Sequence, residues 1–479
     1  MAILSSPGIG SGLDINSLVQ SLVEAERAPA AQRLDRREID LTTKISAFGK
    51  FKASYSALSN KLSALTIADT FRSRKFTSTS ESVLTGSADT KAATGIYDIT
   101  VSKLAKSQSL VTSTSYTART DVVGEGTITI TFGTDPTGSF TANPDKSPVT
   151  IAIDSTNNTL EGVRDAINAA DGGVRASIVN TGSGYVLALS AEDTGAANAM
   201  KIDVVESGPA GLSALAYNAT AQNMQQTRAA QDAEFAIDGV TVTSSGNRVD
   251  SAIDGLTLDL RDVGNSQVSV SLDTASIQEA VSAFVKAYNE FRDQLKELTF
   301  YNPKTRNAGP LNGDSSVRSM ANAIRRYLGD AVEGLSGGLR TLADVGITFD
   351  SDGKMQLDTA RLQDAIDANP QAVEQLFVGE GDSGDPGYVP GIASRLQEYF
   401  SQIEKDDLIG SRINTLNKKV EDLNDDRERL ARRIEQYEAR LMKQYTALDV
   451  LVGQLQNTSA WLQQQLNALP TIQVKTGSK

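Results

Sequence analysis

Side chains able to perform acid–base, nucleophilic or metal chemistry are few in kind in this sequence. The 479 residues include no histidine and no cysteine, which excludes imidazole bases, thiol nucleophiles and metal sites that need either side chain. Carboxylates remain, and Asp406-Asp407 is an adjacent pair of the kind that could share a proton. Neighbouring residues on a helix point about 100° apart, so these two carboxylates do not converge. The sequence therefore predicts no enzyme and no catalytic residue.

Two short motifs are similar to ion or phosphate loops but lack the residues that such sites need. Asp350-Ser351-Asp352-Gly353 resembles the start of a calcium loop, yet the later ligands and the closing glutamate are missing, which favours a hairpin turn. Gly8-Ile9-Gly10-Ser11-Gly12 precedes a helix, but it follows no expected strand and lacks the lysine of a phosphate loop. We therefore predict no metal site and no cofactor.

The longest regular pattern lies in the C-terminal arm, residues 409–469. Its apolar residues alternate at spacings of four and three, which is typical of a helix with one apolar seam. A helix of this length would extend roughly 90 Å and could not bury its seam against itself, so it needs a partner. The predicted coiled-coil seam consists of Ile409, Ile413, Leu416, Val420, Leu423, Leu430, Ile434, Tyr437, Leu441, Leu448, Leu451, Leu455 and Leu462.

The N-terminal part of the chain offers that partner. Asp14 is the expected N-cap of a first helix, and Pro29 is expected to end that helix at Ala28 and to begin another. We expect an antiparallel hairpin within the chain between residues 34–65 and 409–450, with the outermost ends free to contact other subunits. The first helix presents Ile15, Leu18, Val19, Leu22 and Val23, and the N-terminal seam consists of Leu41, Ile45, Phe48, Phe51, Tyr55, Leu58, Leu62 and Leu65.

Three polar residues, Arg427, Gln444 and Thr458, occupy positions in the register of the C-terminal seam. Polar groups inside a coiled coil weaken a dry core but can fix the register of its helices. The alternative is a helix that is solvated locally on this side. The sequence leaves both interpretations open.

From Thr70 onward the chain becomes rich in threonine and serine with alternating apolar residues, which predicts β-strands. Residues 196–226 are rich in alanine, asparagine and glutamine, and we expect them to form irregular surface. Asp238-Gly239 and Asp254-Gly255 each lie between alternating apolar residues and predict two hairpins of one small sheet. Strands are expected at 97–101, 127–132, 149–153, 174–179 and 185–189, and a short helix at 159–168.

Helical patterns return after Asp273, so the chain is expected to fold as an α+β, multidomain protein. Long antiparallel terminal helices would form a coiled-coil or helical-bundle stalk, into which two β-rich domains are inserted. Further helices are expected at 315–328, 358–369, 370–377 and 392–403, a hairpin at 347–357 and a loop at 379–391. The predicted domains are 1–42 with 441–479 (terminal helical leg), 43–77 with 273–440 (helical stalk), 78–106 with 228–272 (β-rich) and 107–227 (outer β-rich).

Charge and hydropathy exclude two classes of partner. The net charge is −13 and basic residues are interleaved with acidic ones, whereas a nucleic-acid or anionic-membrane binder needs a basic stripe. No apolar run approaches the roughly 18 residues of a membrane span, so membrane insertion is not expected. The first residues lack a basic segment followed by an apolar core, so no cleaved signal peptide is expected.

Six groups of short motifs follow one another in order from the first helix to the last. They are Gly10-Ser11-Gly12-Leu13-Asp14 with Leu18-Val19 and Glu24-Ala25-Glu26, Tyr97-Asp98-Ile99-Thr100-Val101 with Leu104-Ala105, Asp232 to Gly239, Phe284 to Asn289, Leu311-Asn312-Gly313-Asp314, and Gly346 to Phe349 with Asp352-Gly353. Together they resemble the flagellar hook-associated protein 2 family, whose members cap the growing bacterial flagellar filament. No single stretch is specific, but their joint order makes the resemblance specific. Residues 160–170 with 174–179 are similar to a flagellin and hook insertion motif.

The resemblance implies a structural protein outside the cell, at the tip of the bacterial flagellum. It implies export through the flagellar type III pathway without a cleaved signal peptide, and a homo-oligomeric ring of five or six subunits joined through the β domains. The ring would retain exported flagellin and promote its folding and insertion as the filament elongates. The implied partners are flagellin, the hook–filament junction proteins and an export chaperone at the C-terminal arm.

A surface adhesin is the alternative function, suggested by the threonine- and serine-rich β region. It predicts that an isolated fragment of residues 108–227 binds a host surface or a glycan. Adhesion and filament capping are compatible in one protein.

Overall fold

The structure is a computed structural model that describes Gly12 and residues 14–468, and it divides into two compact units. Unit 1 comprises the described residues of Met1–Ala68 and Gln278–Lys479, and unit 2 comprises Asp69–Ile277. Unit 2 is therefore an insertion into unit 1, as the nested topology predicted. The finer division into four domains stays a prediction. Most of the glycine-rich stretch 8–12 and the last residue of the arm, Leu469, lie outside the described residues.

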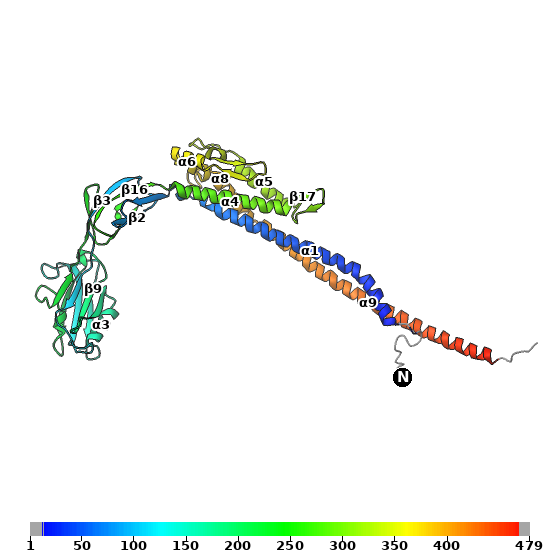
Figure 1. Cartoon of the computed structure of the whole chain (residues 1–479), viewed down its shortest axis with the longest axis horizontal. Coiled ribbons are helices and arrows are strands. Elements are labelled where there is room, and N and C mark those ends of the chain that lie inside the picture. Colours follow the sequence, from blue (N-terminus) through cyan, green and yellow to red (C-terminus); the bar gives the residue numbers. More distant parts are fainter. Residues whose placement is uncertain (1–11, 13, 469–479) are drawn as a thin grey trace, which may run out of the picture. The chain divides into compact units, whose positions relative to one another are not determined.

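Unit 1 is built on two long helices from opposite ends of the chain. Helix α1, Ile15–Ser63, has 49 residues and helix α9, Leu408–Asn467, has 60, so at 1.5 Å per residue α9 extends about 90 Å. They run antiparallel and side by side, and α9 continues past the N-terminal end of α1 (Figure 1). The expected α+β fold with long antiparallel terminal helices is confirmed.

The predicted helix break at Pro29 is wrong, because α1 is continuous through this residue. Proline removes one backbone hydrogen bond and disfavours helix for the residue before it. The helix continues because residues on both sides of Pro29 are held on α9: Val19 packs with Leu441 before it, and Asp35 accepts a hydrogen bond from Arg427 after it. Pro29 itself is exposed, so its ring lies on the solvent side of the helix.

The C-terminal end of α1, from Phe51 onward, packs into a helical bundle. Phe51 contacts Phe291 of α4, with ring centroids 5.8 Å apart, and Tyr55 meets Phe400 of α8 edge-on at 4.8 Å. The Tyr55 hydroxyl also donates to the Phe400 carbonyl oxygen at 3.0 Å. A helix was expected after Asp273, and the other four bundle helices lie within a few residues of their predicted bounds. The bundle helices are α4 (Thr274–Thr299), α5 (Ser315–Gly329), α6 (Thr359–Ala368), α7 (Pro370–Phe377) and α8 (Ile392–Lys405).

Short hairpins lie in the connections between the bundle helices. The predicted hairpin at 347–357 is confirmed as β19 and β20, with the Asp350 carboxylate accepting from the Asp352 and Lys354 amides at 2.9 Å. Gly353 has a φ of +75°, a conformation that favours glycine at this turn. The expected loop at 379–391 instead contains a small hairpin. The short strands are β17 (Tyr301–Asn302), β18 (Asn307–Ala308), β19 (Ile347–Phe349), β20 (Met355–Leu357), β21 (Gly379–Glu380) and β22 (Val389–Pro390).

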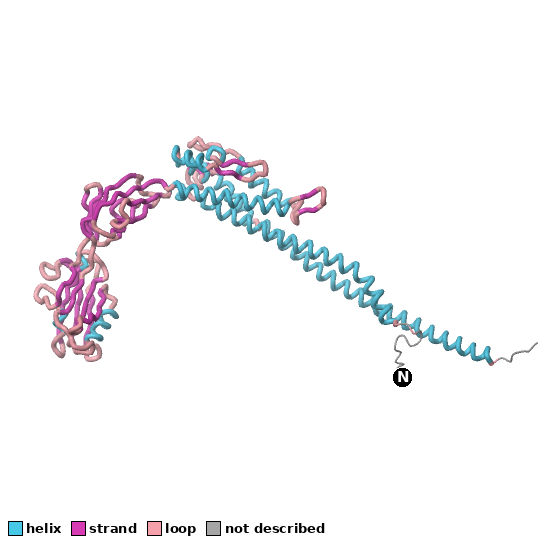
Figure 2. The backbone as a smooth tube through the Cα atoms, in the orientation of Figure 1, coloured by secondary structure: helices cyan, strands magenta, loops and turns pink. Residues whose placement is uncertain are grey.

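Unit 2 is rich in β-strands, which are magenta in Figure 2. Its first hydrophobic core lies between two antiparallel sheets. The two Asp-Gly hairpins form as predicted but belong to different sheets, because β12 pairs with β3 whereas β15 pairs with β2. The five-stranded sheet has the order β1 (Arg74–Ser78), β16 (Gly264–Leu272), β3 (Gly95–Lys103), β12 (Ala233–Ile237) and β13 (Val240–Ser244). The three-stranded sheet has the order β14 (Arg248–Ile253), β15 (Leu256–Leu260) and β2 (Leu84–Ala88).

A second core of unit 2 joins two four-stranded sheets and helix α3 (Leu160–Ala169). The expectation of irregular surface at 196–226 is wrong, because Met200 and Ile202 are fully buried in strand β10 and Leu212 is buried after it. A composition dominated by small and polar residues concealed this short alternation. One sheet contains β10 (Ala199–Glu206), β5 (Gly126–Thr134), β6 (Thr141–Ala142) and β7 (Val149–Ile153), and the other β11 (Met224–Arg228), β4 (Ser109–Thr112), β9 (Tyr185–Ala191) and β8 (Val174–Asn180). Single helical turns occur at α2 (Ala68–Arg72), η1 (Ala64–Thr66), η2 (Ala196–Asn198), η3 (Leu212–Leu215) and η4 (Leu342–Val345).

Candidate functional site

The candidate site is the helical hairpin formed by α1 and α9, together with the part of α9 that continues beyond it. At the N-terminal end of α1, Ile15 and Val19 are 2 % and 1 % exposed and pack with Leu441. Asp14 caps this end, since its carboxylate accepts from the Ser17 amide at 3.0 Å. The pairing thus reaches the first turn of α1, further than the predicted partner segment 34–65.

The predicted C-terminal seam divides into a packed part and an exposed part near Leu441. Up to Leu441 the seam residues are buried or half-buried within the single chain: Ile409, Leu423, Ile434 and Leu441 are buried, and Ile413, Leu416, Val420, Leu430 and Tyr437 are half-buried. Beyond it they are exposed: Leu448 by 49 %, Leu451 by 52 %, Leu455 by 61 % and Leu462 by 49 %. A partner for this distal row stays a prediction.

The N-terminal seam lies in two different environments. Leu41, Phe48, Phe51, Tyr55, Leu58 and Leu62 are buried and Ile45 is half-buried. Around Phe48 the partner is α9, whereas Phe51 and Tyr55 contact helices of the bundle. Tyr55 also lies beside Ile409, near the start of α9. The expected pairing of 34–65 with 409–450 is therefore corrected at its outer end: α9 also packs on residues 15–23 of α1 and leaves α1 near Tyr445.

Arg427, in the seam register, binds across the hairpin. Its guanidinium donates to Asp35 and to Glu38 of α1, each at 2.6 Å. These hydrogen bonds, first from Glu38 and then from Asp35, raise the pKa of Arg427 above its ordinary value. We attribute its position in the seam to this pairing. The two acids, three residues apart on the facing helix, were a signal that sequence reasoning missed.

The other two polar seam residues behave differently. Gln444 and Thr458 are exposed, and the Thr458 hydroxyl donates to the Gln454 carbonyl oxygen of its own helix at 2.8 Å. They lie at and beyond the end of the hairpin, so solvation explains them.

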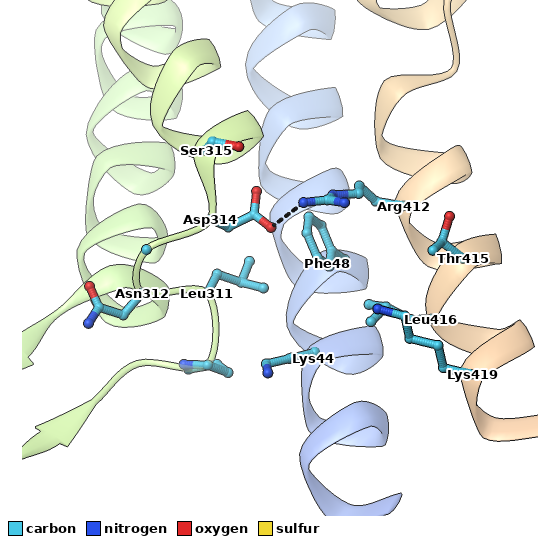
Figure 3. Close-up of a pocket in the computed structure, with 12 residues that line it drawn as sticks. Lys44, Phe48, Leu311, Asn312, Asp314, Ser315, Arg412, Thr415, Leu416 and Lys419 are labelled. Carbon is cyan, nitrogen blue, oxygen red and sulfur yellow. Dashed lines mark hydrogen bonds and ion pairs between the residues drawn. The ribbon is translucent and has the colours of Figure 1, made fainter. Parts of the chain in front are cut away.

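A pocket of about 320 Å³ lies where α1, α9 and the segment before α5 meet (Figure 3). Leu311 is 2 % exposed and anchors this segment. Asp314 caps α5 by accepting from the Ser316 and Val317 amides at 3.0 and 3.3 Å, and it pairs with Arg412 of α9 at 3.3 Å. Burial opposes ionisation of Asp314, but the hydrogen bond from the Ser316 hydroxyl, the two amide hydrogen bonds and Arg412 outweigh it and lower its pKa. The Leu311-Asn312-Gly313-Asp314 motif thus ties the bundle to α9.

Residues 12 and 14–468 contain no group of three or more acidic side chains placed to hold a metal ion. In the same residues, no helix is both long and apolar enough to cross a membrane.

Nearly the whole chain matches known proteins in sequence. Models of the flagellar hook-associated protein 2 N-terminus and C-terminus match residues 11–108 and 230–457. The flagellar hook-associated protein 2 of Escherichia coli K12 is 35 % identical and covers 97 % of this chain and 98 % of its own length. This chain belongs to the flagellar hook-associated protein 2 family.

Other members of the flagellar hook-associated protein 2 family are similar to this chain over most of its length. The A-type protein of Pseudomonas aeruginosa is 32 % identical over 98 % of both chains. A crystal structure of the D1-D2-D3 domains of the flagellar cap protein FliD from Escherichia coli superposes with a TM-score of 0.66 and 32 % identity, and covers 78 % of this chain and 99 % of that one. A flagellin hook IN motif matches residues 127–193, which confirms the resemblance noted for α3 and β8.

Proposed function

We propose that this chain is the structural cap at the distal tip of a bacterial flagellar filament, where it retains exported flagellin and promotes its folding and insertion. Membership of the flagellar hook-associated protein 2 family supports this proposal, as does the similarity to a solved flagellar cap protein. The function is mechanical, so it rests on surfaces rather than on a catalytic constellation.

The observation that carries the proposal is the apolar row on the free part of α9. It is the distal row of Leu448, Leu451, Leu455 and Leu462, which are 49 %, 52 %, 61 % and 49 % exposed. Full burial of a leucine side chain contributes about 1.5–3 kcal/mol, so a partner that covers this row would be held firmly. We propose that the row contacts flagellin at the filament end. The junction proteins and an export chaperone are further proposed partners of the same arm.

The hairpin also suggests when the cap becomes competent. We propose that the chain leaves the cell unfolded through the flagellar channel. The hairpin joins residues near both ends of the chain, Ile15 with Leu441, so it can close only after nearly the whole chain has emerged. Unit 2 is a continuous segment, Asp69–Ile277, and can fold before that. The subunits would then join through unit 2 into a ring of five or six.

The test uses a flagellated bacterium that lacks its own capping gene and matched variants of α9. We expect L451S/L455S/L462S to give few or no filaments and to release flagellin into the medium. The control Q454S/N457S/Q464S changes exposed residues of the same segment and should support normal filaments. An immunoblot of the medium for the variant itself distinguishes failed capping from failed export. Normal filaments and no free flagellin with the exported leucine variant would refute the proposed contact.

A further inference from the structure

Two grooves flank the α1–α9 hairpin at the same point along it. Leu34 and Leu430 line both, so the grooves lie on either side of this pair of leucines. Their volumes are about 400 and 480 Å³. The two grooves differ in the sign of the charges that the chain leaves unpaired there.

The first, the basic groove, carries four arginines and one aspartate. Its lining repeats at spacings of three and four on each helix: Ala30, Arg33, Leu34 and Arg37 on α1, and Asp426, Arg429, Leu430 and Arg433 on α9. Arg429 pairs with Asp426, and Arg433 lies 3.7 Å from Glu26. Within residues 14–468, Arg33 and Arg37 form no ion pair, and like charges four residues apart oppose helix formation. An anionic partner would relieve this repulsion.

The second, the acidic groove, has the opposite excess. Its two arginines are already paired: Arg427 binds Asp35, and Arg27 binds Glu24 at 2.8 Å. Glu435 and Glu438 line the same groove and form no ion pair in the described part of the chain. The lining beside these two glutamates is apolar and includes Ala431 and Ile434. The basic groove likewise has an apolar lining, which includes Ala30 and Leu34.

We propose that a second copy of this chain docks sideways on the hairpin, with the basic groove of one copy against the acidic groove of the next. Complementary charge is the argument for a second copy, because each copy carries both unpaired signs on one short segment of the hairpin. The contact joins two different surfaces, so it is heterologous and can continue from copy to copy. It goes beyond the proposed function, which assigns assembly to unit 2.

The geometry sets the stagger between the copies. Arg433 lies level with Glu26, and Arg427 lies level with Asp35 and Glu38, which places the four arginines of the basic groove around residue 430 of α9. Glu435 and Glu438 lie about seven residues further along α9. At 1.5 Å per residue, neighbouring hairpins are displaced along their axes by roughly 10 Å. A flat, unstaggered contact would not align the charges.

Disulfide crosslinking tests this contact directly, because the chain has no cysteine of its own. The full-length A30C and E438C variants, whose positions lie level at this stagger, are purified separately, mixed under conditions where mass photometry shows assembled protein, and oxidised mildly. We expect a crosslinked dimer of the two variants, about tenfold more abundant than in the control mixture of R36C with E428C, whose substitutions face away from both grooves. High salt should reduce the yield, because exposed charge pairs are screened.

Charge reversal separates the contact from general proximity. R33E/R37E in the A30C chain should abolish its crosslinking to E438C, and E435R in the E438C chain should restore it. Circular dichroism checks that the helices persist. A yield no higher than the control, or crosslinks mainly between two A30C copies, would overturn the proposal. Crosslinking of E438C only to added flagellin would assign the groove to another protein and also overturn it.

Discussion

The sharpest prediction compares two leucines of one seam, Leu441 and Leu451, each changed to alanine. Leu441 is 9 % exposed and packs on Ile15 and Val19, whereas Leu451 is 52 % exposed. Truncating a buried leucine costs the lost burial and a cavity, typically 2–5 kcal/mol. The low end applies here because the site lies near the end of a two-helix hairpin and can partly collapse. We therefore expect L441A to cost about 2 kcal/mol locally.

The assay is hydrogen exchange of the α1 amides at residues 15–23, which report local opening of the hairpin. A cost of about 2 kcal/mol corresponds to exchange that is roughly 30-fold faster at those amides. In L451A the side chain loses little burial and alanine is a good helix former, so exchange should change less than about threefold. Exchange in L441A at the rate of the parent protein, or equally fast exchange of the α1 amides in L451A, would refute this expectation.

Three further predictions concern unit 1. Replacing Tyr55 by phenylalanine keeps the ring but leaves the Phe400 carbonyl oxygen without its donor, so urea unfolding of the helical unit should show a loss of about 1–2 kcal/mol. Burial also raises the pKa of Tyr55. The contribution of Tyr55 to stability is therefore complete below the unfolded tyrosine pKa of about 10 and is lost as pH rises above that value. An alkaline titration of the helical signal should show a shallower loss in Y55F. Replacing Asp314 by alanine removes the α5 cap and the Arg412 pair and should cost about 1–2 kcal/mol of stability, whereas asparagine should retain the cap. Because the pKa of Asp314 is lowered, the parent protein should lose this stabilisation as pH falls below about 4. Reversing Arg427 to glutamate places it against the two α1 carboxylates it normally binds, so hydrogen exchange at residues 27–38 should accelerate, and less so at high salt; equal acceleration at both salt concentrations would contradict an electrostatic cause.

The sequence predicted most elements whose local signals agree with their packing. Alternating apolar residues located β3, β5 and β9, and the 4-3 spacing located both long helices, because burial on one face produces the same period in sequence and in structure. The Asp-Gly turns were found because their backbone conformation favours these residues. Their assignment to two sheets depends on long-range pairing, which no local pattern records.

The misses arise where tertiary packing outweighs a local preference. Pro29 should end a helix by local rules, yet α1 continues because residues before it pack on α9 and residues after it bind Arg427 of α9. The seam is periodic to Leu462, but periodicity alone cannot show that α1 begins at Ile15 and leaves the distal leucines uncovered. Likewise, Arg427 binds Asp35 and Glu38, which lie almost four hundred positions earlier in the chain. The pattern of a single helix does not reveal such a pairing.

The most direct test of the cap assignment is where the protein resides on a growing filament. A D145C variant, changed at an exposed residue of unit 2 in a chain without cysteines, can be labelled with a fluorescent maleimide on living cells that lack their own cap gene. We predict one focus at the distal end of each filament, which stays at that end while flagellin added later lengthens the filament behind it. Label spread along the filament, or left behind at a fixed distance from the cell as the filament grows, would contradict a cap.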